Sequence, residues 1–240
     1  MERVADLRAV DHAAMLALMD AHFRGVTDER FAADLADKDL AVVLRAGDAL
    51  VGFSTLARID ASVGGRPVTA FYSGDTIVRA DARGSAALAR AWSRHVFADA
   101  AAARRDDPER RVVWLLISSG YKTYRFLPTF FRRYLPTASG PPDPGDAALA
   151  AHLARLRYGE RYHAATGVVR LAHPTPLRDG VADVSAARAA DPHVAFFVAA
   201  NPGHADGDEL VCLTDVHEAN VTPAGRRMLG LPAAPDRDRA

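Results

Sequence analysis

Residues 112–118 (VVWLLIS) restrict the possible folds more than any other segment, because every residue before the final serine is apolar. A strand of this composition is stable where both of its faces are buried. It therefore predicts a central strand in a sheet that helices cover on both sides. A charged connection, residues 104–111, precedes the strand, and Ser119 and Gly120 turn the chain directly after it.

Three further runs rich in Val, Ile, Thr and aromatic residues occur earlier, at residues 40–45, 50–59 and 68–78. These residue types favour strands. Turn residues separate the runs, with Gly47 after the first and Gly64 after the second. The spacing predicts a three-stranded antiparallel meander.

Helical periodicity occurs on both sides of this meander. Apolar residues recur every three to four positions across residues 11–23, and Thr27 is a favourable start for a second helix. A long amphipathic helix is expected at residues 85 to about 104. Aromatic residues recur every four positions in residues 121–134, where Pro128 predicts a kink or a late helix start.

The last hundred residues begin with the clearest linker in the chain, residues 138–145 (ASGPPDPG). Apolar residues at helical spacing then predict a helix that ends near Gly167. Further helical segments are expected around residues 181–190 and 192–200.

Charge balance and cysteine content exclude several classes of protein. Lysine plus arginine and aspartate plus glutamate each total 30, whereas a dedicated nucleic-acid-binding protein normally carries a basic excess. The single cysteine, Cys212, excludes an intramolecular disulfide framework and a cysteine-based zinc site. No apolar run approaches the roughly 18 residues of a membrane span. We expect a soluble, cytoplasmic protein that binds neither nucleic acid nor membrane.

A polar loop after residue 203 carries side chains that can ligate a divalent ion: His204, Asp206, Asp208 and Glu209. A solvated turn is the commoner origin of such a composition. We therefore expect no metal site.

The segment with the clearest chemical meaning is residues 73–86, where the last strand of the meander turns into the long helix. The first N–H groups of a helix lack intrahelical partners and carry the positive end of the helix dipole, so small residues there let a phosphate approach. Arg79 and Arg83 flank the turn and can add charge-assisted contacts. The segment predicts an anion site, although such a turn also occurs in proteins without a ligand.

The order of these elements resembles that of the GCN5-related N-acetyltransferase (GNAT) superfamily. The resemblance covers roughly residues 1–135, with residues 168–171 and 209–213 as candidates for the last two strands. It implies a mixed α/β (α+β) fold with a central, mostly antiparallel sheet flanked by helices. The fourth and fifth strands, residues 68–78 and 112–118, should splay apart, and the C-terminal region should be a helical elaboration.

The resemblance also implies a division of the chain. A donor-binding core is expected at residues 1–137, followed by the linker at 138–145. Residues 146–231 should complete the sheet and cover the acceptor side, and residues 232–240 should form a flexible tail.

In that family the turn after the fourth strand carries the motif Q/R-x-x-G-x-G/A and binds the pyrophosphate of an acyl-coenzyme A. Residues 81–86 (DARGSA) match its glycine and alanine but place Asp81 where glutamine or arginine is usual. Pantetheine amides also pair with the backbone of the fourth strand in this family. The resemblance thus implies an acyl-CoA or acyl-carrier-protein thioester as co-substrate, no prosthetic group, and these donor-binding residues: Ile77, Val78, Arg79, Arg83, Gly84, Ser85 and Ala86.

Two residues are candidates for proton transfer. Many members of the family place a general base on the fourth strand, and Asp75 is the acidic residue of that strand here. The alternative is that Gly74 and Asp75 simply form a β-bulge. A tyrosine on the helix after the fifth strand often protonates the leaving thiolate, which points to Tyr124, with packing in the core as the alternative. The expected acceptor-pocket residues are Tyr72, Ser118, Ser119 and Tyr121.

The function that the resemblance implies is N-acyltransfer to a small-molecule nucleophile, with an amine as the expected acceptor. The partners would be this acceptor and the acyl-CoA or acyl-carrier-protein donor, and a homodimer is compatible with the sequence. One alternative is a non-catalytic ligand-sensing or interaction module on the same scaffold. Another is a different small-molecule enzyme in which the same kind of turn occurs.

Overall fold

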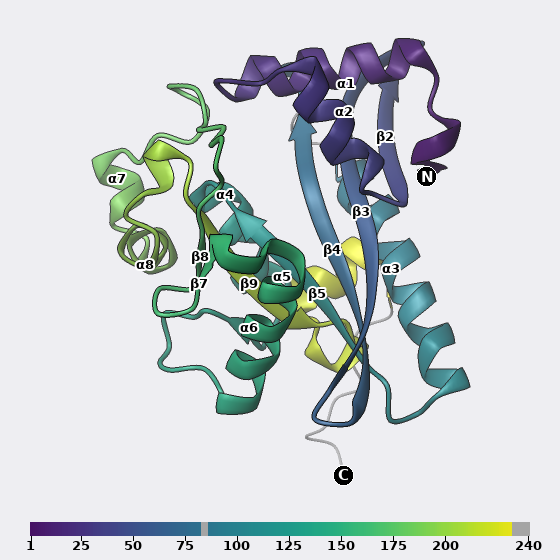
Figure 1. Ribbon diagram of the computed structural model, residues 1–240, viewed down its shortest axis with the longest axis vertical. Coiled ribbons are helices and arrows are strands. Elements are labelled where there is room, and N and C mark those ends of the chain that lie inside the picture. Colours follow the sequence, from purple (N-terminus) through teal and green to yellow (C-terminus); the bar gives the residue numbers. More distant parts are fainter. Residues whose placement is uncertain (83–85, 232–240) are drawn as a thin grey trace.

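A computed structural model describes residues 1–82 and 86–231 of the chain. Across these residues, a single nine-stranded sheet forms the centre of the molecule (Figure 1). The strands are β1 (Glu2–Arg3), β2 (Leu40–Ala46), β3 (Ala49–Val63), β4 (Arg66–Val78), β5 (Arg111–Ser118), β6 (Tyr134–Leu135), β7 (Tyr162–His163), β8 (Val168–Val169) and β9 (Glu209–Asp215).

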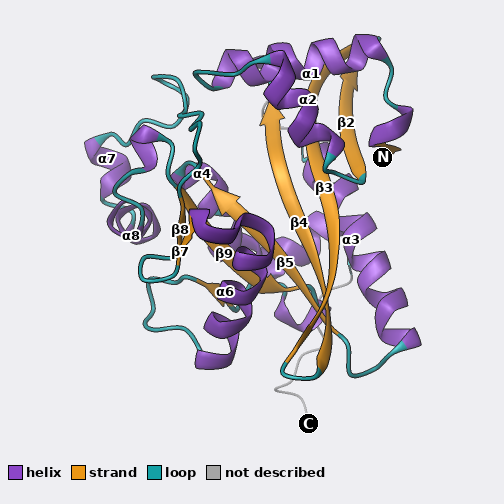
Figure 2. Cartoon of the chain, viewed as in Figure 1, coloured by secondary structure: helices purple, strands orange, loops and turns teal. Residues whose placement is uncertain are grey.

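Helices cover both faces of this sheet (Figure 2). They are α1 (Ala9–His22), α2 (Asp28–Ala36), α3 (Ala87–Asp106), α4 (Tyr121–Tyr124), α5 (Phe126–Phe130), α6 (Pro144–Tyr158), α7 (Ala186–Ala189), α8 (Pro192–Ala200) and α9 (Pro223–Leu229). The first face is covered by α1, α2 and α6, and the second by α3, α4, α5, α8 and α9. Among the helices of the described residues, none has both the length and the apolar character needed to cross a membrane.

The strand order is β1-β2-β3-β4-β5-β9-β8-β7, with β6 also paired to β9. Within the described residues the pairing is antiparallel except between β4 and β5, which are parallel. The predicted meander is present as β2, β3 and β4. The apolar strand β5 lies between β4 and β9 and is largely buried, as its composition requires.

The parallel pair opens midway along its length. Pairing between β4 and β5 runs from Val68–Arg111 to Ser73–Leu116 and stops there. Beyond that point β4 stays paired to β3 and β5 stays paired to β9. In Figure 1 the two arrowheads accordingly point apart, β4 towards α1 and β5 towards α4. The predicted splay of the fourth and fifth strands is confirmed.

Side-chain caps fix where several helices begin. Thr27 Oγ1 accepts a hydrogen bond from the Arg30 N–H at the start of α2, and Asp143 accepts one of 2.8 Å from the Gly145 N–H at the start of α6. Asp191 caps α8 in the same way, with Pro192 at the first helical position. These residues satisfy backbone donors that have no partner inside the helix.

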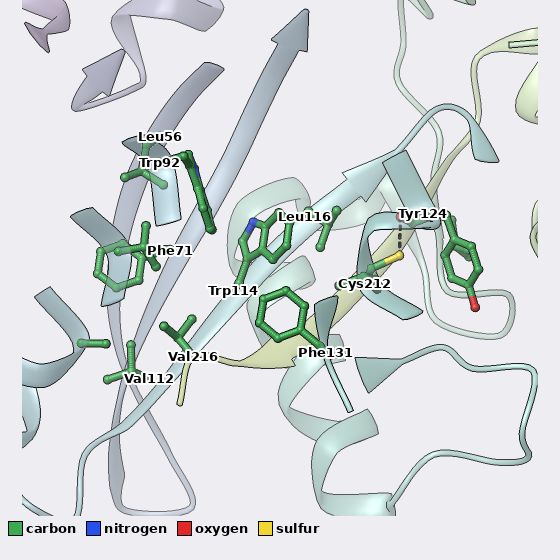
Figure 3. Packing of buried hydrophobic residues seen from close by; sticks show 14 of the residues in the cluster. Leu56, Phe71, Trp92, Val112, Trp114, Leu116, Tyr124, Phe131, Cys212 and Val216 are labelled. Carbon is green, nitrogen blue, oxygen red and sulfur yellow. Dashed lines mark hydrogen bonds between the residues drawn. The ribbon is translucent and has the colours of Figure 1, made fainter. Parts of the chain in front are cut away.

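The core on the second face centres on Trp114 of β5 (Figure 3). Its ring centroid lies 4.6 Å from that of Trp92 and 5.8 Å from that of Phe131. Its indole nitrogen donates a hydrogen bond of 2.8 Å to the Ser73 hydroxyl, so the polar atom of this buried ring is satisfied. Trp114 therefore joins α3, α5 and the point at which β4 and β5 diverge.

The predicted ends of helices and strands are wrong mainly in the C-terminal region. Helix α6 ends at Tyr158 rather than near Gly167, because Gly159 takes a positive φ of 59° that stops the helix. Tyr134 belongs to a strand, β6, instead of a helix. Of the helical segment expected at residues 181–190, only α7 is helical.

A cluster of charges ties α6 to the sheet. Asp146, in the first turn of α6, accepts hydrogen bonds of 2.6 Å from both Arg111 and Arg133, and Arg111 also binds Asp215 of β9. Burial alone would raise the pKa of Asp146, but the two guanidinium groups outweigh it and hold this pKa below its ordinary value.

We expect Asp146→Asn to lower the free energy of unfolding by about 1–3 kcal/mol at neutral pH, because two charge-assisted hydrogen bonds are weakened. A carboxyl whose pKa is lower in the folded state stabilises above its unfolded pKa of about 3.9 and loses this effect as the pH falls through the folded value. Urea denaturation at about pH 7 and about pH 3 measures the difference. An equal cost at both pH values would contradict an electrostatic origin.

Candidate active site

The splay between β4 and β5 opens into a cavity of about 620 Å³. Residues from both diverging strands line it, together with residues from α1, α2, α3 and the turn after β5. The lining includes Trp92 and Trp114 from the second face of the sheet and Tyr72 and Tyr158 from the first face. The cavity thus passes between the two strands, and side chains from both faces of the sheet line it.

A β-bulge in β4 shapes the cavity wall. The register with β3 places Thr76 opposite Ser54 but Ser73 opposite Leu56, so β4 has one extra residue at Gly74–Asp75. A Cβ atom on Gly74 would overlap Thr55 Oγ1 and would lie 2.6 Å from Lys38 Cε. Glycine is therefore needed for this close approach. The bulge expected as one interpretation of Gly74 and Asp75 is present.

Asp75 lies in the bulge and lines the cavity. The residue is half-buried. Burial raises the pKa of Asp75 to about 7, the charge of Asp34 adds to the rise, and Lys38 opposes it. A carboxyl with this pKa is partly ionised at neutral pH and is suited to accept a proton.

Asp34 of α2 and Lys38, two residues after this helix, lie next to the bulge. The Lys38 side chain is fully buried, with its ammonium 2.7 Å from the Asp34 carboxylate and 2.9 Å from the Asp34 carbonyl oxygen. The same ammonium lies 5.6 Å from the centroid of the Tyr72 ring. The Arg157 guanidinium is 4.6 Å from that centroid and pairs with Asp37. Two cations that already have carboxylate partners therefore pack on Tyr72.

One buried acidic residue that the sequence analysis did not assign to the site is Glu209, the first residue of β9. It is only 8% exposed, lines the cavity, and accepts a hydrogen bond of 3.1 Å from the Ser119 hydroxyl. Burial raises the pKa of Glu209 to about 8, the Ser119 hydrogen bond opposes this rise, and the charges of Asp75 and Asp34 add to it. The sequence signal was an acidic residue at the start of an otherwise apolar strand.

A pair of tyrosines completes this side of the cavity. The Tyr158 hydroxyl donates a hydrogen bond of 2.7 Å to the Tyr72 hydroxyl, and the rings meet edge to face. Burial raises the pKa of both phenols above the ordinary value, so both stay protonated at neutral pH. They present hydroxyl groups, not charges, to the cavity.

The other half of the cavity is adjacent to the start of α3. Leu88 and Ala89 from the first turn of this helix line it, as do Lys122 and Thr123 of α4. Trp92 also lines it, and its buried indole N–H has no hydrogen-bond partner among the described residues. A buried donor of this kind is satisfied when a ligand brings an acceptor atom into the cavity.

A segment from the C-terminal region, residues 171–182, crosses the mouth of the splay, and we call it the strap. It pairs with the end of α1, where the Arg24 N–H donates to the Pro176 carbonyl at 2.9 Å and Leu177 is bridged to Phe23. On the other side of the splay, Lys122 of α4, the helix that follows β5, donates a hydrogen bond to the Val181 carbonyl of the strap. The residues of the strap that line the cavity are Leu171, His173, Thr175, Leu177, Val181 and Ala182.

The structure brings some of the predicted site residues together at this cavity: Tyr72, Asp75, Ile77, Val78 and Ser119 all line it. Arg79 lies just beyond β4, where its guanidinium pairs with Asp81 at 2.6 Å, and Ala86 is the N-cap residue of α3. The predicted donor-binding residues Arg83, Gly84 and Ser85 lie outside the described residues.

Other predicted site residues are directed elsewhere. The buried Ser118 hydroxyl donates to the Gly120 carbonyl at 2.9 Å, and Tyr121 packs in the core on the second face. Neither belongs to the lining that the described residues form around the cavity.

Tyr124, which belongs to the buried cluster drawn in Figure 3, also lies outside the cavity lining. Its ring is fully buried and stacks on Phe196 of α8, and its hydroxyl donates to the Pro136 carbonyl at 3.0 Å. The structure therefore does not bring this hydroxyl to Asp75, and the packing role weighed as its alternative is the one that its contacts fit.

The acidic loop before β9 does not gather its side chains around one point. His204 Nδ1 is 2.8 Å from the Asn201 carbonyl oxygen, Asp208 pairs with Arg170 at the surface, and Glu209 faces the cavity. In the stretches of chain that the structure describes, no group of three or more His, Cys, Asp or Glu side chains is placed to hold a metal ion.

No family model and no curated protein sequence matches this chain. Several solved structures are similar to segments of it. The first is a conserved protein of unknown function from Enterococcus faecalis V583, described as a probable N-acyltransferase, with 14% identity over 53% of this chain and 32% of that chain, at a TM-score of 0.40. Another is an aminoglycoside 6'-acetyltransferase type Ii, with 15% identity over 54% of this chain and 81% of that chain, at a TM-score of 0.33.

A third is a GCN5-related N-acetyltransferase from Kribbella flavida, with 16% identity over 72% of this chain and 45% of that chain, at a TM-score of 0.37. The matched regions thus span less than half of two of these three proteins. The fold itself is read from the topology of this chain, in which two helices, a meander, a bulged fourth strand and a splayed parallel fifth strand follow one another. The chain has the mixed α/β fold that the resemblance to the GCN5-related N-acetyltransferase superfamily predicts.

Proposed function

We propose that this protein is an acyltransferase that moves an acyl group from a pantetheine thioester to a small amine. The observation that carries the proposal is the cavity in the β4–β5 splay, which has Asp75 in its wall. A cavity that passes between two strands can hold a donor from one face of the sheet and an acceptor from the other. The donor is an acyl-CoA or the acyl group of a carrier protein.

Three features support donor binding in the half of the cavity near α3. Beyond Ser73 the edge of β4 faces the opening instead of β5, and such an edge can pair with the amides of an extended ligand. The start of the 20-residue helix α3 supplies the positive end of a helix dipole for phosphate groups. The unpartnered N–H of Trp92 offers a further donor.

Asp75 is suited to the role of general base in this reaction. It would take the proton that the attacking nitrogen loses as the carbon–nitrogen bond forms, and the carbon–sulfur bond then breaks. Backbone N–H groups at the mouth of the splay would polarise the thioester carbonyl. The strap and the pair Tyr72–Tyr158 would shape the acceptor side, which gives the C-terminal region a role in acceptor selection.

Donor binding is tested by the unfolding temperature with acetyl-CoA, with coenzyme A and with acetyl-pantetheine. A ligand that binds only the folded state stabilises it by about 2.7 kcal/mol at a hundred times its Kd. We expect a rise with acetyl-CoA in the wild type. A rise with acetyl-pantetheine alone would favour a carrier-protein donor, and no rise with any of the three would contradict the proposal.

Ala89→Glu should abolish the rise with acetyl-CoA, whereas Ala89→Gln should keep most of it. A carboxylate in the first turn favours the helix itself, so the folded state is not weakened, but it repels a phosphate at the same helix end. The glutamine variant has nearly the same size and no charge, and controls for the volume of the side chain. An undiminished rise in Ala89→Glu would place the donor phosphates elsewhere.

Transfer itself is tested by following release of free thiol from acetyl-CoA in the presence of primary amines, such as ethanolamine, tyramine, spermidine and free amino acids. The proposal predicts turnover with at least one class of amine. Binding of acetyl-CoA without turnover on any amine would favour the sensing module instead.

A further inference from the structure

In acyl transfer from a thioester the nitrogen loses a proton and the sulfur gains one, and positioned side chains can assist both transfers. Asp75 on β4 fits the first role. The departing sulfur also takes up a proton, and the Tyr124 hydroxyl does not line the cavity and is bonded to the Pro136 carbonyl. A side chain that assists this step must therefore come from elsewhere in the cavity lining.

Glu209 and Ser119 have the placement that this second role requires. They lie at the start of β9 and directly after β5, so they are across the splay from β4. Both line the cavity, and the Ser119 hydroxyl is 3.1 Å from Glu209 Oε1. Asp75 on one diverging strand thus faces a hydroxyl–carboxyl pair associated with the other.

Burial favours the neutral form of Glu209 and raises its pKa, although the Ser119 hydrogen bond opposes this rise. Asp75 from β4 and Asp34 from α2 act on it as like charges, and both raise its pKa. Tyr158 from α6 and Tyr72 from β4 contribute neutral hydroxyl groups. The cations that pack on the Tyr72 ring have carboxylate partners of their own, as described above. With a pKa of about 8, Glu209 holds a proton at neutral pH, while Asp75 at about 7 is partly ionised.

We propose that Ser119 and Glu209 form the proton-donating arm of the transfer, in which the Ser119 hydroxyl protonates the departing sulfur and the Glu209 carboxyl replaces the proton on Ser119. This inference rests on the proposed acyltransferase function. The two tasks are then divided across the splay, with the base on β4 and the acid on β9.

The protons balance in this scheme. A neutral amine attacks the thioester carbonyl carbon, a carbon–nitrogen bond forms, and one N–H proton passes to Asp75. When Glu209 is neutral, its carboxyl O–H can donate to Ser119 Oγ across the same 3.1 Å contact, the reverse of the hydrogen bond described above, and this leaves the Ser119 proton for the sulfur. The carbon–sulfur bond then breaks, and the sulfur takes the Ser119 proton while the Glu209 proton moves to Ser119 Oγ. The products are the amide and the free thiol. Asp75 has then gained one proton and Glu209 has lost one, and exchange with solvent after product release resets both.

The test compares Glu209→Gln with the wild type, using acetyl-CoA and the best amine of the panel described above. An amide still accepts the hydrogen bond from Ser119, so a purely structural role would survive this change, but it supplies no proton. We expect kcat to fall by about 100-fold or more, with KM for acetyl-CoA nearly unchanged. The wild-type rate should fall above about pH 8 as Glu209 ionises, and the variant should lose this alkaline limb.

Ser119→Ala should lower kcat to a similar extent, and Ser119→Thr, which keeps the hydroxyl, should restore most of it. Asp206→Asn is the matched control, because Asp206 is exposed on the loop just before β9 and its substitution removes the same kind of charge. It should leave both kcat and the pH profile unchanged. Wild-type rates and pH dependence in Glu209→Gln would overturn the inference while the acyltransferase function stands.

A second measurement needs no acceptor. Infrared difference spectra between the wild type and Glu209→Gln, both loaded with acetyl-CoA, report whether Glu209 is a neutral carboxylic acid. We expect its C=O band at about pH 7 and its loss above about pH 9. Absence of the band at neutral pH would overturn the inference. A wild type that shows no binding of acetyl-CoA, coenzyme A or acetyl-pantetheine would instead contradict the proposed function.

Discussion

Replacing Asp75 by asparagine should lower kcat for acyl transfer by about 10²–10⁴-fold, the usual range for loss of a general base. Asparagine has nearly the same shape, so the bulge and the cavity should remain. Because the base must be ionised to accept a proton, wild-type activity should rise as the pH rises through about 7, the value to which burial raises the pKa of Asp75. The variant should lose this acidic limb.

The measurement is the pH dependence of kcat and of kcat/KM, with the unfolding temperature as a check on the fold. Asp48→Asn, at the exposed turn between β2 and β3 and outside the cavity lining, makes the same chemical change and should behave as the wild type. Retention of the acidic limb in Asp75→Asn would mean that another group accepts the proton. An unchanged acetyl-CoA-induced rise in unfolding temperature would show that only the chemical step is affected.

Replacing Gly74 by alanine should lower the free energy of unfolding by about 2–3 kcal/mol, at the upper end of the range for overpacking a filled site. The added Cβ would overlap Thr55 Oγ1 and would lie 2.6 Å from Lys38 Cε. Neither neighbour can yield easily, because Thr55 is fully buried in β3 and the Lys38 ammonium is bound to Asp34. Urea denaturation monitored by tryptophan fluorescence measures the change.

A double-mutant cycle with Thr55→Ala separates this clash from a general loss of backbone freedom. Removing the threonine side chain makes room beside the bulge, so Gly74→Ala should cost clearly less in the Thr55→Ala background. An equal cost in both backgrounds would show that the contact with Thr55 is not the cause. Because the bulge also carries Asp75, Gly74→Ala should lower kcat by a larger factor than the loss of folded protein explains.

The first half of the fold could be predicted because its signals are local. The meander follows from strand-forming residues between glycine turns, and α2 begins at Thr27 because a hydroxyl caps its first turn. The strap could not be predicted in the same way. Residues 171–182 are fixed through backbone hydrogen bonds to the end of α1, more than 100 residues earlier in the chain, as from Arg24 to Pro176.

The residues of the candidate site also differ in whether local sequence or long-range pairing places them. Asp75 and Tyr72 could be found because they lie on one strand of a predictable meander. Glu209 could not, since its neighbours in sequence form a polar loop and only the pairing of β9 with β5 brings it to Ser119. Tyr124 is a predicted site residue but packs against α8. Helical spacing shows which residues share one face of a helix, but it does not show what that face packs against.

The position of β9 has a consequence for the order in which this protein can assemble during synthesis. The pairings within the meander are local, so the meander can form soon after it leaves the ribosome. Strand β5, however, has one edge that is closed only by residues 210–215, about 100 positions later. An apolar strand with an unpaired edge is prone to associate with other chains. Nascent chains that pause between these two strands should therefore depend on chaperones more than the finished protein does.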